Sequence, residues 1–335
     1  MIRPNKKRIL VTGGAGYVGS IVIRQLLKQG YKVVCVDNLR FGGLSLVDVQ
    51  DNIDFEFKKI DITNFKDLDD IFDLYDFYAV VHLAAIVGDP ACKLQPKLAI
   101  KTNKDASIHL LEKAMQSNTR RFIFASTCSN YGKMNSDGYV DEESPLTPVS
   151  LYAELKVGFE KKILRALKKE TDFCPTVLRF ATIYGISPRM RFDLTVNEFT
   201  KELAMGKELQ VYGEQFWRPY CHLNDISQAI LKVLQAPERA VSYEVFNVGD
   251  TSQNYTKKMI VEELLKQIPD GRVKYVHKEE DPRDYRVNFD KIKKNLEFRI
   301  SKTVSEGIQD IRTSLSDGII SDPDDQKYYN TPRLK

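Results

Sequence analysis

The chain has 335 residues, which at about 150 residues per domain predicts roughly two domains. Hydrophobic residues make up 42% and charged residues 29%, so the composition excludes a disordered or fibrous chain as the overall description. The 50 lysines and arginines nearly balance the 46 aspartates and glutamates, giving a net charge of +4. This near balance argues against a dedicated nucleic-acid-binding protein, which usually carries a strong basic excess.

The cysteines and the apolar runs favour a cytoplasmic protein. Five scattered cysteines without a CxxC pair predict neither a disulfide framework nor a metal site. No apolar run approaches about 18 residues, so no membrane span is predicted. The basic start is followed by a short strand at residues 9–11 that glycines soon end, unlike the longer apolar part of a signal peptide. We expect reduced thiols and neither a nucleic-acid nor a membrane partner.

The first half of the chain alternates short apolar runs with helical patterns. The predicted strands are residues 8–13, 32–37, 54–61, 79–85, 120–127 and 175–180. The predicted helices between them are residues 17–29, 65–75, 98–117 and 151–169. Continuous apolar strands that alternate with helices predict a parallel sheet covered on both faces. The expected fold class is therefore α/β, with a Rossmann-like doubly wound parallel sheet and a smaller mixed α/β substrate domain.

The alternation ends near residue 186. Further helices are predicted at 194–205, 225–236, 256–267 and 303–315, and further strands at 208–213 and 246–250. We expect the strand at 246–250 to rejoin the sheet, so that the two domains interleave. The predicted Rossmann domain is 1–185 plus about 225–250, the substrate domain is 186–224 plus about 251–320, and 321–335 is a poorly ordered tail.

A glycine-rich turn follows the first predicted strand. Residues 12–19 read TGGAGYVG and contain Gly14-x-Gly16-x-x-Gly19 between a strand and a helix. In such a turn the glycines permit a tight bend, a close approach of the pyrophosphate and close packing of helix on strand. The helix N-terminus adds amide donors and a positive dipole. The turn therefore predicts a dinucleotide site.

The second predicted strand ends at Asp37, 18 residues after Gly19, close to the spacing typical of dinucleotide sites. A carboxylate at this place accepts hydrogen bonds from ribose hydroxyls and repels a 2′-phosphate, so NAD is favoured over NADP. Arg40 lies nearby and weakens that preference slightly.

Three further features fall where a hydride-transfer site needs them. Tyr152 and Lys156 are four residues apart and share one face of a predicted helix, where the lysine charge stabilises the phenolate. Such a phenol can take a proton from an alcohol. A Ser/Thr-rich turn that includes Thr127 ends the fifth strand, at the edge where parallel sheets bind ligands. The small residues after His82 would let a cofactor lie close to the fourth strand.

In combination these motifs resemble the extended short-chain dehydrogenases/reductases of the nucleotide-sugar epimerase/dehydratase group. The matching pieces are TGGAGYVG, Asp37, Asp61-Ile62, the HLAA run at 82–85, Asn103, the turn ending in Tyr131-Gly132, Tyr152-x-x-x-Lys156 and the segment 218–225. The resemblance runs from about residue 8 to 315. It implies a NAD-dependent enzyme with Thr127, Tyr152 and Lys156 as its catalytic set.

The resemblance also implies which residues hold the cofactor. Asp61 and Ile62 would bracket the adenine, and Lys156 would hold the nicotinamide ribose. The full predicted NAD set is Gly13, Gly16, Tyr17, Val18, Gly19, Asp37, Asn38, Asp61, Ile62, Leu83, Ala84, Ala85, Asn103, Tyr152 and Lys156.

The turn after Thr127 bears on the reaction. In 4,6-dehydratases of this group an Asp-Glu pair follows the hydroxyl residue, and it acts as the acid and base for loss of water. Here Cys128 and Ser129 follow Thr127, so no paired base is visible. We therefore favour chemistry confined to C4 of a nucleotide sugar, as a 4-dehydrogenase or 4-epimerase, over a dehydratase. We interpret Cys128 as a small packed residue.

Residues that would bind the substrate lie mostly in the second half. Clustered arginines fit a diphosphate, because the guanidinium fork matches phosphate oxygens. The predicted substrate set is Val87, Cys128, Ser129, Asn130, Thr182, Arg189, Arg191, Asn197, Arg218, Asp281 and Arg283, with Arg218 as the best single candidate. The loop 86–93 and the stretch 187–197 resemble a subgroup that oxidises C4 of GDP-linked heptoses.

Two further expectations complete the sequence-based interpretation. A nucleotide-binding regulator on the same fold is the non-catalytic alternative, because fold does not guarantee activity. Such proteins usually lose the tyrosine or the lysine, whereas this chain keeps Tyr152 and Lys156. The resemblance also implies a homodimer in which helices near 98–117 and 151–169 pair across a two-fold axis.

Overall fold

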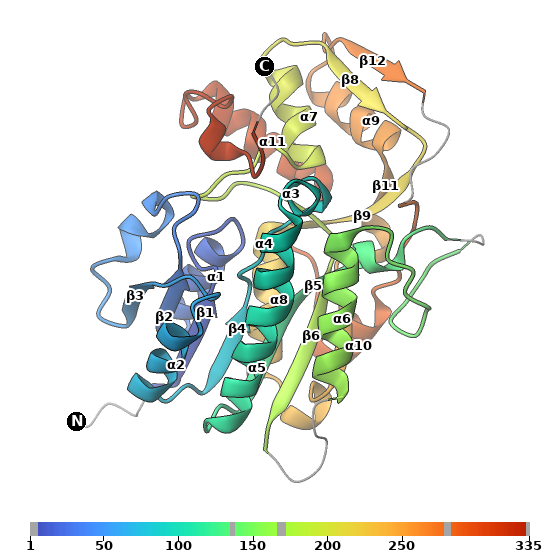
Figure 1. Ribbon diagram of the computed structural model, residues 1–335. Coiled ribbons are helices and arrows are strands. Elements are labelled where there is room, and N and C mark those ends of the chain that lie inside the picture. The colour runs from blue at the N-terminus through green and yellow to red at the C-terminus, as the bar shows by residue number, and fades with distance from the viewer. Residues whose placement is uncertain (1–5, 135–137, 166–171, 278–282, 333–335) are drawn as a thin grey trace. The chain divides into compact units, whose positions relative to one another are not determined.

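The computed structural model describes residues 6–134, 138–165, 172–277 and 283–332. The chain divides into two compact units, which are described separately below (Figure 1). The first unit comprises Met1–Thr127, Ser150–Arg179 and Ser227–Phe246, and the second comprises Cys128–Val149, Phe180–Ile226 and Asn247–Lys335. The segment after Thr127, which the sequence analysis assigned to the Rossmann domain, therefore groups with the second unit.

A seven-stranded sheet is built in the order β10-β6-β5-β4-β1-β2-β3. Its strands are β1 (Arg8–Thr12), β2 (Lys32–Asp37), β3 (Phe55–Lys59), β4 (Ala79–His82), β5 (Arg121–Thr127), β6 (Cys174–Phe180) and β10 (Glu244–Val248). The pairs β1–β2, β2–β3, β1–β4 and β4–β5 are all parallel. The predicted strands are thus confirmed, including the return of the 246–250 run to the sheet.

The strand order creates a reversal beside β1. The chain builds β2 and β3 outward on one side of β1 and then crosses to β4 on the other side. The chain segments that follow β1 and β4 therefore lead to helices on opposite faces of the sheet. In open α/β sheets this switch point is where ligands bind.

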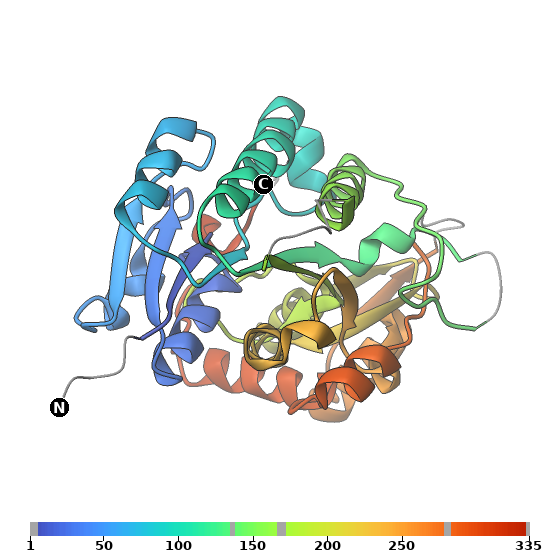
Figure 2. The same ribbon diagram turned by 90° about the horizontal axis from the view of Figure 1, so that it is seen from below.

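Helices cover both faces of this sheet (Figure 2). Helices α2 (Phe65–Leu74), α5 (Ser107–Gln116) and α6 (Leu151–Arg165) lie on one face, and α1 (Gly19–Lys28) and α8 (Leu223–Gln235) on the other. The long helix predicted at 98–117 is continuous but not uniform. It consists of α4 (Pro96–Ile100), a π-helical segment Lys101–Ala106 and α5, and a short α3 (Asp89–Leu94) precedes it.

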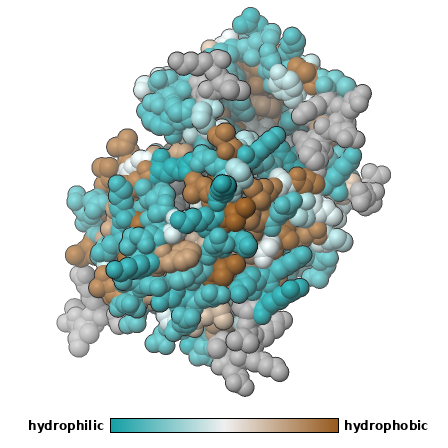
Figure 3. Space-filling model, viewed as in Figure 1, coloured by the Kyte–Doolittle hydropathy of each residue, from teal (hydrophilic) through white to brown (hydrophobic). Residues whose placement is uncertain are grey.

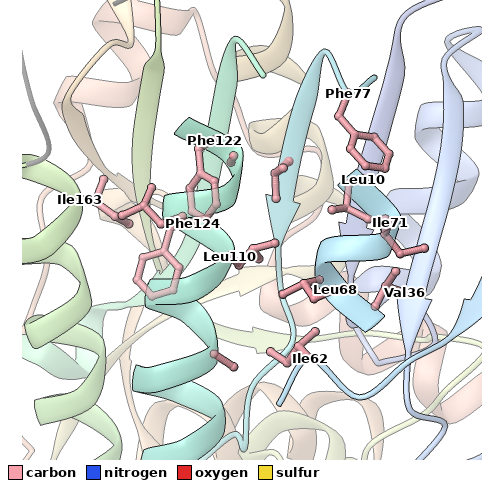
Figure 4. Close-up of a cluster of buried hydrophobic side chains, with 14 of the residues drawn as sticks. Leu10, Val36, Ile62, Leu68, Ile71, Phe77, Leu110, Phe122, Phe124 and Ile163 are labelled. Carbon is pink, nitrogen blue, oxygen red and sulfur yellow. The ribbon is translucent and has the colours of Figure 1, made fainter. Parts of the chain in front are cut away.

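The core of the first unit lies between the sheet and helices α2, α5 and α6 (Figure 4). Leu10 and Val36 from the strands and Leu110 from α5 are almost fully buried, as are Phe122 and Phe124 of β5. Burying one such side chain stabilises the fold by about 1.5–3 kcal/mol. The continuous apolar runs of the sequence are thus the strands whose side chains are buried beneath the helices.

The second unit contains two small sheets and four helices among its described residues. Strands β7 (Thr182–Tyr184), β9 (Trp217–His222) and β11 (Asn254–Thr256) form one sheet, and β8 (Leu209–Tyr212) pairs in parallel with β12 (Val273–Val276). Its helices are α7 (Thr195–Ala204), α9 (Lys257–Gln267), α10 (Asp290–Leu296) and α11 (Val304–Ser316). Sequence reasoning missed β7, β9, β11 and β12. Each of these strands is either only three or four residues long or interrupted by charged residues.

The C-terminal segment corrects one expectation. Residues 321–332, predicted to be poorly ordered, form a turn and the 3₁₀ segment Gln326–Tyr328, and Tyr329 is 8% exposed. Hydrogen bonds to the loop before α7 and to α7 itself hold this segment in place. No helix in the described part of the chain is long and apolar enough to cross a membrane.

Candidate active site

The glycine turn is a place where two loops of the first unit come very close. Gly13 follows β1 with a φ of +76°, a conformation that favours glycine. A Cβ on Gly13 would lie 2.7 Å from the main-chain nitrogen of Ala84, in the loop after β4. The absence of a side chain on Gly13 and the small side chain of Ala84 therefore let the loops meet at the switch point.

The last glycine of the motif sets how α1 begins. A Cβ on Gly19 would lie 2.2 Å from the carbonyl oxygen of Gly13, so only glycine lets the helix start against the turn. The predicted contact residues Tyr17 and Val18 precede α1 directly, and the main-chain nitrogen of Gly16 donates to the oxygen of Gly13 over 3.2 Å. The turn therefore delivers a helix N-terminus to the carboxyl edge of the sheet, where it can bind an anion.

Asp37 is fixed at the end of β2 by the main chain around it. One carboxylate oxygen accepts from the nitrogen of Ala15 at 3.0 Å, and the other accepts from the nitrogen of Leu39 at 2.8 Å. The Arg40 guanidinium donates to Gln95 at 3.0 Å. The carboxylate thus stands beside the glycine turn, as the predicted NAD site requires.

Asn38 and Asp61, two residues of the predicted NAD set, are neighbours in the structure. The side-chain amide of Asn38 donates to the Asp61 carboxylate over 2.9 Å. Burial alone would raise the pKa of Asp61, but hydrogen bonds from Asn38 and Thr63 and the charge of Lys101 lower it overall. The Ile62 side chain is 5% exposed and belongs to the hydrophobic core. Any contact of Ile62 with a cofactor would therefore involve its main chain.

A buried histidine ties the two strands at the switch point. The ring nitrogens of His82 are 2.8 Å from the Thr12 hydroxyl and 2.9 Å from the Ser107 hydroxyl. Burial and the nearby charge of Lys156 lower the pKa of His82 to about 3, so the ring is neutral. His82 therefore links β1, β4 and α5, a role that the sequence analysis did not assign.

Asn103 holds the loop that follows β4. Its amide oxygen accepts from the main-chain nitrogen of Ile86 at 2.8 Å, and its amide nitrogen donates to the oxygen of the same residue at 2.9 Å. The loop residues Leu83, Ala84, Ala85 and Val87 are partly exposed. Asn103 lies in the π-helical segment, which turns its buried amide toward this loop. Asn103, a predicted NAD residue, therefore fixes the conformation of the loop after β4.

Tyr152 and Lys156 lie on one face of α6, as the four-residue spacing predicts. The Lys156 ammonium is 5.8 Å from the centre of the Tyr152 ring and donates to the oxygen of Ala125 in β5 over 2.6 Å. Lys156 is 5% exposed, and burial lowers its pKa to about 8. Thr127, the last residue of β5, is 9% exposed. The three predicted catalytic residues thus come from one strand end and the helix packed on it.

A buried ion pair fixes α6 against the sheet. The Glu160 carboxylate binds the Arg179 guanidinium of β6, with 2.8 Å between Oε2 and Nη2, and also accepts from the Ser126 hydroxyl of β5. Glu160 and Arg179 are 1% and 4% exposed. Sequence reasoning missed this pair, although Glu160 follows Lys156 by one further helical turn and so lies on the same face.

In the second unit, Cys128 and Tyr131 both point to one amide. The Tyr131 hydroxyl donates to Asn247 Oδ1 at 2.8 Å, and the Cys128 sulfur lies 3.9 Å from the same oxygen. Cys128 is 1% exposed, and Asn130 is fully buried. The main-chain nitrogen of Asn247 donates to Glu142 at 2.7 Å. The turn after β5 is thereby fixed to the end of β10.

Three predicted substrate residues gather around Tyr285. The Arg218 guanidinium lies 5.3 Å from the centre of the Tyr285 ring, and the Tyr285 hydroxyl is 3.5 Å from that of Ser129. Burial raises the pKa of the Tyr285 phenol, and the charges of Arg218 and Arg283 oppose that increase, so both cations are near it. Tyr285 is a member of this cluster that sequence reasoning missed.

The remaining predicted residues of the second unit lie on β7, on α7 or in the loop that joins them. Arg191 is paired with Asp193 through two bonds of 2.9 Å, and Asn197 bridges the oxygen of Arg191 to the nitrogen of Gly185. Arg189 is 6% exposed, and Thr182 begins β7. Asp281 lies outside the described residues.

Comparison with known proteins decides the family. Residues 9–249 match the NAD dependent epimerase/dehydratase family. The chain belongs to this family. The UDP-glucuronate 4-epimerase of Thermodesulfobacterium geofontis is 29% identical over 312 residues, covering 90% of this chain and 93% of that protein.

Two solved structures are similar to this family member over nearly their whole length. The UDP-glucose 4-epimerase of Thermotoga maritima with UDP-glucose has a TM-score of 0.83 at 28% identity, covering 93% of this chain and 99% of that one. The dTDP-glucose 4,6-dehydratase of Bacillus anthracis in complex with NAD has a TM-score of 0.81 at 25% identity, covering 94% and 98%. The chain is therefore a NAD-dependent nucleotide-sugar enzyme of the extended short-chain dehydrogenase/reductase type, as the resemblance implied. These relatives act on UDP- and dTDP-sugars by their names, and none is a GDP-heptose enzyme.

The residues of the first unit fit NAD. The side-chain-free turn at Gly13, the N-terminus of α1 and the Asp37 carboxylate at the end of β2 offer a pyrophosphate and a ribose the partners they need. Lys156 lies within the same unit, beside Tyr152. When bound, NAD supplies the acceptor for a hydride from a substrate alcohol.

Proposed function

We propose that this enzyme oxidises C4 of a nucleotide sugar to a 4-keto species and carries out no chemistry beyond C4. The product is then a 4-keto sugar or, after return of the hydride to the other face, the C4 epimer. The observation that carries this proposal is the combination of Thr127, Tyr152 and Lys156 with Cys128 and Ser129 where dehydratases of the group keep an Asp-Glu pair.

The catalytic residues divide the proton chemistry between them. The Tyr152 phenolate would accept the proton of the C4 hydroxyl, while the buried Lys156 ammonium stabilises the negative oxygen. The Thr127 hydroxyl would hold the sugar oxygen by a hydrogen bond. The Lys156 charge is effective because burial leaves few water molecules to screen it.

The surroundings of Cys128 support chemistry confined to C4. Loss of water from a 4-keto sugar needs an acid and a base close to the reacting carbons. The Cys128 thiol is buried and lies against Asn247, and Ser129 lies against the Tyr285 hydroxyl. Neither position offers the carboxylate that a dehydratase would use.

The nucleotide is a separate proposal. The named relatives act on UDP- and dTDP-sugars, whereas the stretches 86–93 and 187–197 resemble enzymes for GDP-linked heptoses. We therefore propose a pyrimidine or guanine nucleotide whose diphosphate meets arginines of the second unit, with Arg218 as the first candidate. A dehydratase remains the alternative.

The test is incubation of the purified enzyme and NAD with UDP-, dTDP- and GDP-sugars, with products followed by NMR and reduced nicotinamide by absorbance. A C4 epimer without net reduction would support an epimerase, and a 4-keto sugar with stoichiometric reduction would support a dehydrogenase. Loss of the C6 hydroxyl would contradict the proposal in favour of a dehydratase. Binding of NAD without turnover of any sugar would favour the non-catalytic alternative.

We also propose a homodimer through α5 and α6. A groove on the first unit is lined by residues of these two helices and the π-helical segment, namely Lys104, Ile108, Glu154, Leu155, Gly158 and Phe159. Apolar side chains gather in this region, between α4 and α6 (Figure 3). A Cβ on Gly158 would meet nothing within 4 Å, so a partner helix could approach closely.

Light scattering tests the dimer. We expect Gly158→Arg to give a folded monomer, because the added side chain meets nothing in its own chain but obstructs a partner helix. Gly158→Ala is the matched control and should remain dimeric. A monomeric wild type, or a dimer that Gly158→Arg does not weaken, would contradict the proposal.

A further inference from the structure

The C-terminal segment packs on the loop that carries two predicted substrate arginines. This strap, defined as residues 320–332, belongs to the second unit together with the loop 187–194 and helix α7. The main-chain nitrogen of Phe192 donates to the oxygen of Tyr328 at 3.0 Å, and the two rings meet edge to face at 5.6 Å. Phe192 is fully buried. The strap therefore packs directly against the loop 187–194.

A buried lysine anchors the strap to α7. The Lys201 ammonium, 1% exposed, is 2.8 Å from both the Asp324 carboxylate and the Tyr329 hydroxyl. Burial alone would lower the pKa of Lys201, but its hydrogen bonds to Asp324, Glu202 and Tyr329 raise it overall. The Tyr329 hydroxyl in turn donates to the oxygen of Pro323 at 3.2 Å. Displacement of the strap would leave this buried ammonium without two of its partners, which is costly.

The Asp193 carboxylate connects the strap to Arg191, one of the arginines predicted to bind the diphosphate. Asp193 accepts two bonds of 2.9 Å from Nε and Nη2 of Arg191 and a third of 3.2 Å from the main-chain nitrogen of Asn330. Burial alone would raise the pKa of Asp193, but the Arg191 charge and these hydrogen bonds lower it overall. The carboxylate is therefore ionised and holds the guanidinium plane. Nη1 is the nitrogen outside the pair.

We propose that the strap positions Arg191 for the diphosphate of the nucleotide sugar, with Asn330 and Tyr329 as positioning residues. This inference rests on the proposed function, because it takes the substrate to be a nucleoside diphosphate sugar. A guanidinium binds a phosphate best when its plane is held before the ligand arrives. Asp193 fixes that plane, the Asn330 nitrogen fixes Asp193, and the Lys201 anchor fixes the strap.

The test compares Asn330→Pro, which removes the main-chain donor, with Asn330→Ala, which keeps it. Tyr329 is extended, with φ −128° and ψ 140°, a conformation that tolerates a following proline. We expect Asn330→Pro to raise KM for the nucleotide sugar about tenfold, the effect of one lost charge-assisted hydrogen bond, with kcat within about twofold. Asn330→Ala should keep the wild-type KM. Tyr329→Phe, which removes one partner of Lys201, should raise KM in the same direction.

A second background separates positioning from a general loss of structure. In an Arg191→Ala enzyme the positioned group is gone, so Asn330→Pro should raise KM no further. An equal rise in both backgrounds, or a wild-type KM in both Asn330→Pro and Tyr329→Phe, would overturn the role of the strap. Thermal unfolding of each variant verifies that it is folded. If Asn330→Pro does not fold, the KM of Tyr329→Phe tests the role of the strap instead.

The proposed function fails in a different way from the strap. If the wild type neither turns over a nucleotide sugar nor binds UDP, dTDP or GDP, both proposals fall. If the wild type is active and Arg191→Ala leaves KM unchanged, only the strap proposal falls and the C4 reaction stands.

Discussion

Glu160 of α6 and Arg179 of β6 form an ion pair from which water is almost fully excluded. Glu160 is one helical turn beyond Lys156, and its carboxylate also accepts from Ser126, directly before Thr127. The ion pair joins α6 to β6, and the Ser126 hydrogen bond joins it to β5, so the two contacts together fix where α6 lies on the sheet. Tyr152 and Lys156, the proposed catalytic residues on α6, are therefore positioned by these contacts.

Removing one member of that pair should destabilise the protein strongly. Glu160→Gln leaves the Arg179 charge buried without a counter-charge, which costs about 3–5 kcal/mol. We expect a corresponding loss in the free energy of unfolding measured by denaturant titration. The double variant Glu160→Leu/Arg179→Met should recover much of that loss. The control is Arg120→Met, which breaks an exposed pair with Glu238 and should change stability little.

Tyr152→Phe should abolish most turnover without weakening the fold. The variant keeps the ring beside Lys156 but lacks the oxygen that accepts the substrate proton, so kcat should fall about 100- to 10,000-fold. Calorimetry should show that NAD still binds, because the glycine turn, Asp37 and Lys156 are kept. The half-exposed Tyr139→Phe serves as control and should keep the wild-type rate. A retained rate in Tyr152→Phe would refute its assignment as the base.

The preference for NAD should depend on the charge of Asp37. Asp37→Asn keeps an oxygen that can accept from Leu39 but removes the negative charge that repels a 2′-phosphate. We expect the affinity for NAD to fall about tenfold or more and the affinity for NADP to rise. Fluorescence titration with both cofactors measures this change. The exposed Asp51→Asn should alter neither affinity, and an unchanged ratio in Asp37→Asn would contradict the ribose role.

Lys156 should make stability depend on pH in the alkaline range. Its folded pKa is about 8, against 10.5 for an ordinary lysine, so the unfolded chain holds the proton more tightly. Burial of the charged lysine therefore destabilises the folded state. This destabilisation is fully present below pH 8 and disappears as the pH rises toward 10.5. Relative to Lys156→Met, the wild type without NAD should gain on the order of 2–3 kcal/mol in unfolding free energy between pH 7 and pH 10.

The control for this titration is on the same helix. Lys162 is about half exposed and pairs with Glu112 on the surface. Lys162→Met makes the same substitution at this surface position and should change the free energy of unfolding little. A parallel pH profile for wild type and Lys156→Met would show that the folded lysine titrates normally.

Much of this protein could be predicted from local sequence patterns. The glycine turn, Asp37, and the spacing of Tyr152 and Lys156 are local signals, because a strand end, a turn and a helix face each involve residues close in the chain. The alternation of apolar runs with helical patterns predicted the α/β sheet in the same way, and the sequence motifs alone implied the family and its cofactor. The turn after Thr127 distinguished C4 chemistry from dehydration only as a hypothesis.

Tertiary structure alone decided which distant residues meet. Glu160 forms an ion pair with Arg179, and Tyr285 contacts Ser129 and Arg218. Lys201 donates hydrogen bonds to Asp324 and Tyr329 near the C-terminus. These partners are far apart in the chain and have no common spacing, so no periodic pattern marks them. Their pairing follows from burial, because a charge removed from water must find a partner wherever the packed chain supplies one. For that reason the polar tail, which by composition alone looked unstructured, is held against α7 by a buried lysine.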